Sequence, residues 1–528
     1  MGMRGKFALG AGALCCMAFA PAFAVNLRCA SVGTLSADLA ARRITSQSLV
    51  RAYEARIARI NPKIHAVIAL NPRAMAEARA SDARRAAGHP LGPLDGLPIL
   101  VKDNIDIAGL PTTAGSLALA KNVRTVSATV IRNLRRAGVV ILGRTNLSEW
   151  ANIRSEHSTS GWSAVGGLTR NPYMLDRTAC GSSSGSAAAV AAGLAAAAIG
   201  TETDGSITCP SAMNGVVGLK PTVGLVSRTG IVPISRTQDT AGPIARTVRG
   251  AAMLLTAMAG SDPADPATVH ANAHRTNYAA ALNPDALRGV RLGIAEFLLK
   301  NYTPKTLAVF DHALKLLKAE GAVLVKVDDY HMAPLEKNEN LVLLTELKVD
   351  MKAYLAGSPP AVKSRTLADL IAFDNTHPRE MRWFGQSLFL QAERTKGLND
   401  PAYIRAHETN LRLAGPDGID RLLKQHRVAA LIAPTQNPAS VIDLVNGDAG
   451  IGGGDSTLPA VAGYPYITVP MGQVQGLPVG LSFIGPKWSE ARLLGLGYAF
   501  ERVARAFQPP TYARDVQHWR PSKAVCRY

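Results

Sequence analysis

Two stretches rich in glycine and serine stand out in the sequence. Residues 179–186 read Ala-Cys-Gly-Ser-Ser-Ser-Gly-Ser, and residues 200–210 read Gly-Thr-Glu-Thr-Asp-Gly-Ser-Ile-Thr-Cys-Pro. The first is followed by an alanine-rich stretch, residues 187–198, which predicts a helix. Backbone amides in such a loop ahead of a helix form an anion-binding site. Because each stretch borders an apolar helix or strand pattern, we interpret both as site loops and not as flexible linkers.

Outward from these stretches, helical and strand patterns alternate along the chain. Leu49, Tyr53 and Ile57 recur at helical spacing after a Thr45 N-cap, and Asn61-Pro62 predicts the end of that helix. Helices are predicted at 45–60, 73–87, 127–137 and 304–320, and strands at 64–70, 96–101, 139–142, 290–297, 322–327 and 428–433. Such alternation predicts an α/β fold.

Composition excludes several classes of protein. With 47% hydrophobic and 18% charged residues among 528, the chain is neither disordered nor a coiled coil. The net charge is +19, but no block of five lysine or arginine residues occurs, so we expect no nucleic-acid partner. No apolar run is long enough to span a bilayer, so we expect no integral membrane segment.

The N-terminus has the pattern of a secretory signal peptide. Arg4 and Lys6 precede the apolar stretch 7–20, and Ala22-Phe23-Ala24 is a small-x-small cleavage site. We therefore predict a signal peptide at 1–24 and an exported protein, periplasmic or secreted. Cleavage leaves residues 25–528, a length of 528 − 24 = 504, and lowers the net charge to +19 − 2 = +17.

Four cysteines remain after cleavage. Cys29 and Cys526 lie near the two ends of the chain, which are often close together in compact domains, so an oxidising compartment permits a disulfide between them. Two unpaired thiols on the tails are the alternative. We interpret Cys180 and Cys209 as small buried thiols. No Cys/His spacing matches a zinc site, so no metal is expected.

Two catalytic interpretations compete. Residues 181–185 fit the G-x-S-x-G nucleophile elbow with Ser183 as nucleophile, but that elbow needs a preceding strand, and residues 171–178 are polar and turn-like. The second interpretation uses Lys102, which follows a predicted buried strand. Burial lowers the pKa of a lysine, and a neutral lysine can serve as general base for a serine. For Lys102 alone, a salt bridge with Asp103 or Asp106 is the alternative.

In combination, these stretches resemble the amidase signature family. The matching segments are 92–98, 101–104, 143–150, 181–186, 200–210, 214–222, 239–243, 462–465 and 477–481. The resemblance implies a single large α/β/α sandwich whose central twisted mixed sheet is covered by helices. It also implies one amidase domain over 25–528, with its signature core at about 92–250.

The resemblance assigns roles residue by residue. Lys102 takes the place of the family's lysine, Ser182 that of the bridging serine held by a cis peptide bond, and Ser206 that of the nucleophile. The amides that bind the oxyanion fall on Thr203, Asp204, Gly205 and Ser206, and no cofactor is implied. The chain departs from the family at Cys180 and Asp204, where glycine is usual.

Within that family, the strings at 145–152, 180–187, 200–206 and 367–373 look like those of the bacterial peptide amidase subgroup. This implies hydrolysis of a C-terminal or small primary carboxamide to carboxylate and ammonia through a Ser-Ser-Lys triad and an acyl-enzyme. Asn152 and Tyr464 are candidate substrate-binding residues, together with the glycine-rich loop 446–456.

Three alternatives to a peptide amidase remain. The family's glutaminyl-tRNA amidotransferase A subunits share the core, but they are cytoplasmic and work inside a complex, and the signal peptide argues against that role. The chain could also hydrolyse another amide or ester. The third alternative is an inactive envelope-binding protein with the same fold.

Overall fold

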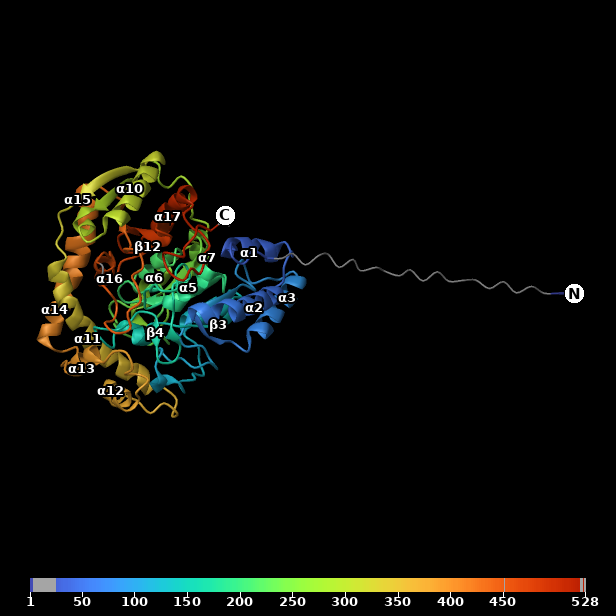
Figure 1. The fold of residues 1–528 in the computed structure, drawn as a ribbon, viewed down its shortest axis with the longest axis horizontal. Helices are drawn as coiled ribbons and strands as arrows, with labels where there is room; N and C mark the ends of the chain where they lie inside the picture. Colours follow the sequence, from blue (N-terminus) through green and yellow to red (C-terminus); the bar gives the residue numbers. More distant parts are fainter. Residues whose placement is uncertain (3–24, 451, 523–525, 527–528) are drawn as a thin grey trace.

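The computed structural model describes residues 1–2, 25–450, 452–522 and 526, so most of the predicted signal peptide lies outside the described residues. Its centre is an 11-stranded sheet with the order β1-β3-β2-β6-β8-β7-β12-β13-β11-β9-β10 (Figure 1). The strands are β1 (Val67–Leu70), β2 (Pro98–Lys102), β3 (Val140–Thr145), β6 (Ala197–Glu202), β7 (Val217–Lys220), β8 (Thr240–Ala245), β9 (Arg291–Ala295), β10 (Val323–Val327), β11 (Ala430–Pro434), β12 (Tyr466–Val474) and β13 (Leu477–Ile484). A separate hairpin pairs β4 (Trp162–Ser163) with β5 (Gly167–Leu168).

The sheet is mixed. Strand β2 runs parallel to both β3 and β6, whereas β6, β8, β7, β12, β13 and β11 follow one another in antiparallel pairs. Strands β11, β9 and β10 are parallel again. Every residue of β2, β3, β6, β7, β8, β11 and β13 is buried, which requires cover on both faces of the sheet.

Helices supply that cover, and in Figure 1 helices α1–α3 and α11–α14 lie on opposite sides of the molecule. The helices are α1 (Val32–Ala40), α2 (Ser46–Ile64), α3 (Ala74–Ala86), α4 (Thr129–Arg136), α5 (Ser184–Ala192), α6 (Thr208–Met213), α7 (Val248–Met258), α8 (Ala271–His274), α9 (Glu296–Leu299), α10 (Pro304–Ala319), α11 (Ala333–Ala356), α12 (Leu367–Thr376), α13 (Ser387–Glu393), α14 (Pro401–Ala414), α15 (Arg421–His426), α16 (Thr457–Ala462) and α17 (Glu490–Ala504). The predicted α/β class with a central mixed sheet is therefore confirmed.

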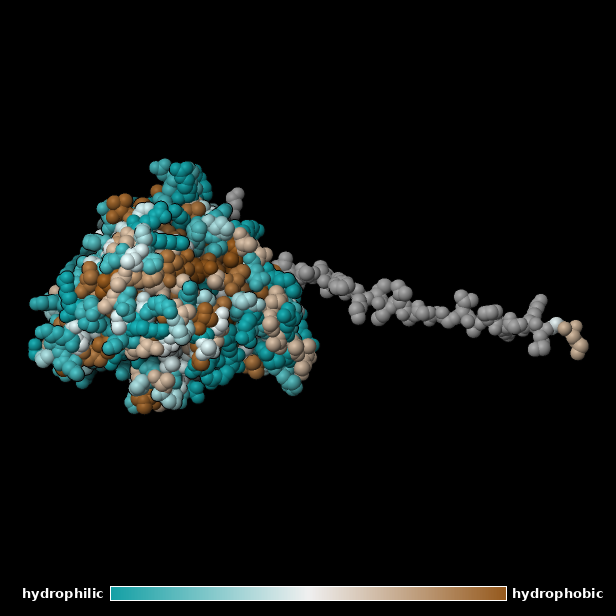
Figure 2. Space-filling model, turned by 90° about the horizontal axis from the view of Figure 1, so that it is seen from below, coloured by the Kyte–Doolittle hydropathy of each residue, from teal (hydrophilic) through white to brown (hydrophobic). Residues whose placement is uncertain are grey.

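The face of the molecule that is seen in Figure 2 is mostly polar. Hydrophilic side chains cover most of the face in Figure 2, and hydrophobic ones gather in a band across its upper part. Among the residues that the structure describes, no helix combines the length and the apolar character needed to cross a membrane.

Several element boundaries differ from the predictions, and two of the differences bear on how the chain is organised. Helix α2 continues through Pro62 to Ile64, because the Asn61 side chain accepts hydrogen bonds from the amides of Ala66 and Val67, each at 2.8 Å, and so organises the exit from the helix. The prediction of a helix over 187–198 is also wrong, because the helix ends earlier. Helix α5 ends at Gly193, whose φ of 70° is left-handed, and β6 begins at Ala197.

Helix α5 sets the position of the first glycine- and serine-rich stretch. All of its residues are buried, as expected for a helix that is apolar on every side. A Cβ atom at Gly185 would lie 2.4 Å from the carbonyl oxygen of Ala66 and 2.6 Å from that of Asn146. The start of the helix therefore packs directly against backbone, which fixes the residues immediately before it.

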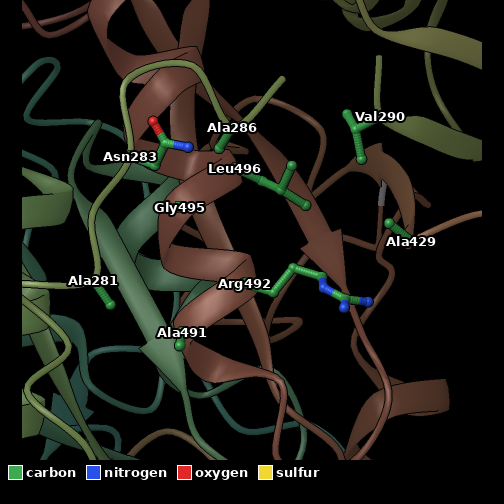
Figure 3. A pocket seen from close by; sticks show the side chains of 9 residues that line it. All are labelled: Ala281, Asn283, Ala286, Val290, Ala429, Ala491, Arg492, Gly495 and Leu496. Carbon is green, nitrogen blue, oxygen red and sulfur yellow. The ribbon is translucent and has the colours of Figure 1, made fainter. Parts of the chain in front are cut away.

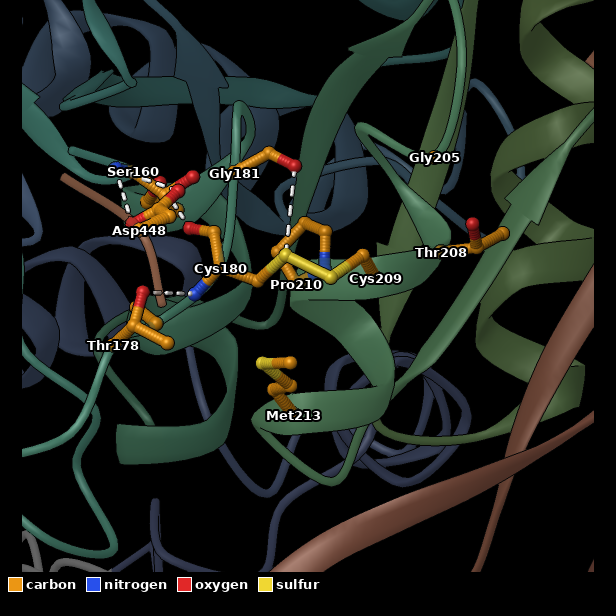
Figure 4. Close-up of a disulfide and its surroundings, with 12 residues drawn as sticks. Ser160, Thr178, Cys180, Gly181, Gly205, Thr208, Cys209, Pro210, Met213 and Asp448 are labelled. Atoms are coloured by element: carbon orange, nitrogen blue, oxygen red, sulfur yellow. Dashed lines mark hydrogen bonds between the residues drawn. A yellow bond between two sulfur atoms is a disulfide. The ribbon is translucent and has the colours of Figure 1, made fainter. Parts of the chain in front are cut away.

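Both cysteine pairs are disulfides. Cys29 and Cys526 are bonded with a Cα–Cα distance of 5.2 Å, as the closeness of the chain ends allowed. The interpretation of Cys180 and Cys209 as buried thiols is wrong, because they form a second disulfide with a Cα–Cα distance of 6.1 Å (Figure 4). They lie 29 residues apart, on either side of α5 and β6, and only the packing of these elements brings them together.

Candidate active site

The site is built around Lys102, the last residue of β2. Its side chain is 0% exposed, and its Nζ lies 2.8 Å from Ser182 Oγ. The same nitrogen lies 2.9 Å from Thr201 Oγ1 and 3.2 Å from the Thr201 carbonyl oxygen. Because β6 is the parallel neighbour of β2, Thr201 near the end of β6 reaches the lysine at the same edge of the sheet.

Burial dominates the electrostatics of Lys102. It lowers the pKa of the amine to about 7, against the opposing influence of the Glu202 and Asp239 carboxylates. The alternative salt bridges are not formed. Asp103 pairs with Arg144 at 3.1 Å, and Asp106 lies 3.5 Å from Arg124. These carboxylates therefore point away from the amine, and Lys102 is a buried amine without a carboxylate partner among the described salt bridges.

Ser182 follows a cis Gly181–Ser182 peptide bond, as the resemblance implied. Its carbonyl oxygen accepts a hydrogen bond from the Ser148 amide at 3.1 Å. Gly181 has no room for a side chain, because an added Cβ atom would lie 2.1 Å from Ser148 Oγ. The backbone on both sides of this peptide bond is therefore held by the segment that contains Ser148.

Ser206 lies in the tight loop between β6 and α6 and is 8% exposed. Its carbonyl oxygen accepts a hydrogen bond from the Ser183 amide at 3.1 Å, which joins this loop to the Ser182 segment. The fold thus brings the neighbourhoods of Lys102, Ser182 and Ser206 together.

Ser183 occupies a different environment. Its side chain is fully buried, and its hydroxyl donates to the Thr201 carbonyl at 3.1 Å. The same hydroxyl oxygen accepts from the Thr201 amide at 3.3 Å. Residues 171–178, which the structure describes throughout, contain no strand that could deliver a nucleophile elbow. Ser183 therefore links α5 to β6.

Of the four amides predicted to bind the oxyanion, one already donates a hydrogen bond within the protein. The Gly205 amide donates to Glu202 Oε1 at 3.0 Å and is not free for an oxyanion. The amides of Thr203, Asp204 and Ser206 donate to no acceptor in the part of the chain that the structure describes. These three amides are therefore the predicted donors that remain available to a developing negative charge.

Glu202 is the residue that sequence reasoning missed. Its buried carboxylate accepts hydrogen bonds from the amides of Ile207 at 2.7 Å and Thr208 at 3.0 Å, in addition to Gly205. The Tyr466 hydroxyl donates to it as well, at 2.5 Å. The sequence held one signal for this role, since Glu202 ends an apolar strand and lies a few residues before a helix. Glu202 holds the loop that carries Ser206 to the start of α6.

The Asp204 side chain, an unusual feature of this loop, contacts other elements. Its Oδ2 accepts a hydrogen bond from Thr457 Oγ1 at 2.7 Å, at the start of α16. It also lies beside Glu339 of α11, whose pKa is raised well above its ordinary value by burial and then by the Asp204 charge. The carboxylate thus ties the loop to the helices around it.

The two candidate substrate-binding residues are placed differently. Asn152 lies beside the Ser182 segment, since its Nδ2 would be 3.2 Å from a Cβ atom at Gly181. Its Oδ1 is buried and has no partner in the described part of the chain. Tyr464 is 9% exposed, and its hydroxyl donates a hydrogen bond to Asp420 Oδ2 at 2.7 Å. The structure brings Asn152 to the site, whereas the Tyr464 hydroxyl points to Asp420.

A separate pocket lies away from the Lys102 site. It has a volume of about 510 Å³ and is lined mostly by alanine and other apolar residues of 281–290 and α17, with Arg492 as its only charged residue (Figure 3). No serine or lysine lines it. It therefore lacks the groups that amide hydrolysis through a nucleophile requires.

With this geometry in place, comparison with known proteins identifies the class. The chain belongs to the amidase family, whose profile matches residues 48–494. It is 38% identical over 486 residues to a probable amidase of Arabidopsis thaliana, covering 89% of each chain. It is 35% identical over 500 residues to the A subunit of the glutamyl-tRNA(Gln) amidotransferase of Chloroflexus aggregans, covering 90% of this chain and 96% of that one.

Among solved structures, the native peptide amidase from Stenotrophomonas maltophilia is 50% identical, with a TM-score of 0.87 over 91% of this chain and 98% of that chain. The peptide amidase in complex with the competitive inhibitor chymostatin is also 50% identical, with a TM-score of 0.88 over 91% and 99%. The protein is an amidase of the amidase signature fold and is structurally close to peptide amidase.

The role of Glu202 can be tested with Glu202→Gln. The substitution keeps the shape but places an amide NH2 group against backbone N–H donors, and each buried donor left unsatisfied costs about 1–3 kcal/mol. We predict a lower urea midpoint of unfolding together with a fall in turnover of at least about tenfold, because the loop holding Ser206 loses its anchor.

Glu490→Gln is the matched control for Glu202→Gln, since Glu490 is equally buried and accepts the Thr222 amide at 2.7 Å outside this loop. It should lower stability without the loss of turnover. Equal turnover losses in the two variants would contradict the assigned role.

Proposed function

We propose that this amidase hydrolyses the C-terminal carboxamide of peptides with a Ser206-Ser182-Lys102 triad. The observation that carries the proposal is the 2.8 Å contact between the buried Lys102 Nζ and Ser182 Oγ. The nearby carboxylates of Asp103 and Asp106 do not pair with this amine, because each pairs with an arginine. An uncharged amine in this position can accept a proton from a serine.

In the proposed mechanism, Ser206 Oγ forms a bond to the amide carbon while its proton passes to Ser182, whose own proton passes to Lys102. The oxyanion is bound by the amides of Thr203, Asp204 and Ser206, with about 3–4 kcal/mol of transition-state stabilisation from a key donor. The C–N bond then breaks, the relay returns the proton to the leaving nitrogen, and ammonia departs. Water hydrolyses the ester at Ser206 by the same route.

The peptide as substrate is supported by similarity. The Stenotrophomonas enzyme named as a peptide amidase shares half of its residues with this chain over nearly its whole length. The peptide amidase that was solved in complex with the competitive inhibitor chymostatin is also 50% identical to this chain. In the proposed binding mode, Asn152 Oδ1, a buried acceptor without a partner among the described residues, receives a hydrogen bond from the carboxamide NH2 group.

Hydrolysis of small amides is the second candidate, because the family profile itself specifies only an amidase. Ammonia release from a peptide amide, a short aliphatic amide and glutamine separates the candidates. We expect the highest kcat/KM for the peptide amide. A preference for glutamine would instead favour the activity named for the amidotransferase relatives.

The Ser206 assignment is tested by Ser206→Ala. Turnover should fall by at least about three orders of magnitude, because no other group can form the acyl-enzyme, while the unfolding midpoint stays unchanged. Ser183→Ala is the control, since its hydroxyl is fully buried and bonded to Thr201, and it should cost much less. If Ser183→Ala were inactive and Ser206→Ala active, the nucleophile would be Ser183 and not Ser206.

The charge state of Lys102 predicts the pH dependence. Below its pKa of about 7 the amine is protonated and cannot accept a proton, so kcat/KM should rise with pH along a limb centred near that value. The midpoint belongs to the coupled Lys-Ser-Ser unit. Lys102→Met should remove most activity and flatten the limb, and Lys102→Arg should be inactive because guanidinium stays protonated. An arginine variant with normal turnover would show that residue 102 supplies only charge.

We also propose that the protein is exported and that its mature N-terminus is Val25. The pattern of residues 1–24 supports this, and so do the two disulfides, which persist in oxidising compartments. N-terminal sequencing of the protein from the periplasm or medium should begin at Val25. Recovery of the full chain with Met1 in the cytoplasm alone would contradict export.

A further inference from the structure

The Cys180–Cys209 disulfide joins the two segments that carry the serines of the proposed site. Cys180 lies two residues before Ser182, and Cys209 lies three residues after Ser206, in the first turn of α6. Figure 4 shows the bond between the loop that leads to Gly181 and the helix that begins at Thr208. The shortest covalent path between the two serines therefore runs through this bond and not along the chain.

The backbone at Cys180 makes the cysteine unexpected. Its φ is +54°, in the left-handed region that glycine adopts without cost and other residues avoid. Its amide donates to Thr178 Oγ1 at 3.1 Å, and its carbonyl accepts from Ser184 Oγ at 2.5 Å. A side chain at such a position is kept only where the surrounding structure holds it, and this points to a use for the sulfur.

Two hydrogen bonds also join these segments. The Ser183 amide donates to the Ser206 carbonyl at 3.1 Å, and Asn214 Nδ2 donates to the Ala179 carbonyl at 2.9 Å. The disulfide lies between these two hydrogen bonds along the segment. It packs against Met174, Met213 and Leu477, and Cys209 is 7% exposed whereas Cys180 is partly exposed.

We propose that the Cys180–Cys209 disulfide is a positioning element of the active site, which sets the geometry between Ser182 and Ser206 and makes the reactivity of Ser206 depend on the oxidised state. The inference rests on the proposed function for the roles of these serines. A dithiol reductant that cleaves the bond converts the two sulfurs to thiols and is itself oxidised to a disulfide. The serine segments then lose their covalent link and are held together by hydrogen bonds and packing alone.

The test compares the double variants C180S/C209S and C29S/C526S, each of which removes one of the two disulfides. The readouts are kcat and KM for a peptide amide, the midpoint of the pH limb, and the rate at which a fluorophosphonate probe labels Ser206, followed by mass spectrometry. Loss of Cys180–Cys209 should lower kcat and the labelling rate by about 10–100-fold, because small displacements of a nucleophile have such effects.

The other readouts separate positioning from general stability. In C180S/C209S, KM should stay within about twofold of the parent, and the pH midpoint should move because the Lys-Ser-Ser unit is rearranged. In C29S/C526S, kcat, labelling rate and pH midpoint should match the wild-type protein, even where its thermal midpoint falls. Equal kcat in the two double variants would overturn the proposal.

Two further arms complete the test. C180G/C209S relieves the left-handed backbone at position 180 but lacks the bond, and recovery of the wild-type labelling rate in this variant would also overturn the proposal. Dithiothreitol added to C29S/C526S should lower labelling of Ser206 to the level of C180S/C209S. Labelling of Ser206 needs no amide turnover. If the probe labels Ser206 but the protein releases no ammonia, the proposed function is refuted. The labelling rates then still show whether the disulfide positions Ser206.

Discussion

The rest of the site depends on one contact, between the amine of Lys102 and the hydroxyl of Ser182, in a fully buried place where the nearest carboxylates in the sequence pair with arginines. A buried charge is costly unless it is paired, so the amine at this position favours its neutral form. The sheet enforces this arrangement. Strand β2 lies between β3 and β6, and every residue of β2 is buried. The two carboxylates that follow Lys102 form ion pairs with Arg144 and Arg124.

The second constraint is the loop between β6 and α6. Glu202 accepts three backbone amides and the Tyr466 hydroxyl, so a single carboxylate determines which amides of the loop remain free. The Gly205 amide donates to Glu202, and those of Thr203, Asp204 and Ser206 have no acceptor among the described residues. Helix α5, small and buried throughout, brings Ser182 to the same place by packing directly on backbone. The two serine segments are thus held by different elements and are joined covalently by Cys180–Cys209.

Much of this was predictable from the sequence, and what was not has definite physical reasons. Lys102 could be predicted from its own segment, because it directly follows an apolar strand pattern, and the cis bond before Ser182 was implied by the resemblance to the amidase signature family. The division of 187–202 into α5 and β6 does not, since a run of alanines carries neither a helical nor a strand periodicity. The Cys180–Cys209 bond and the role of Glu202 depend on packing between separate elements, which spacing alone does not reveal.

The most direct measurement of the general-base role is the titration of the Lys102 amine itself. In protein labelled with ¹³C at lysine Cε, NMR spectra across pH identify the Lys102 signal by its loss in Lys102→Met. We predict that this one lysine changes charge with a midpoint near 7, because burial lowers its pKa to about 7. A Lys102 amine that stays charged until above pH of about 10, like an exposed lysine, would contradict the general-base role on which the mechanism depends.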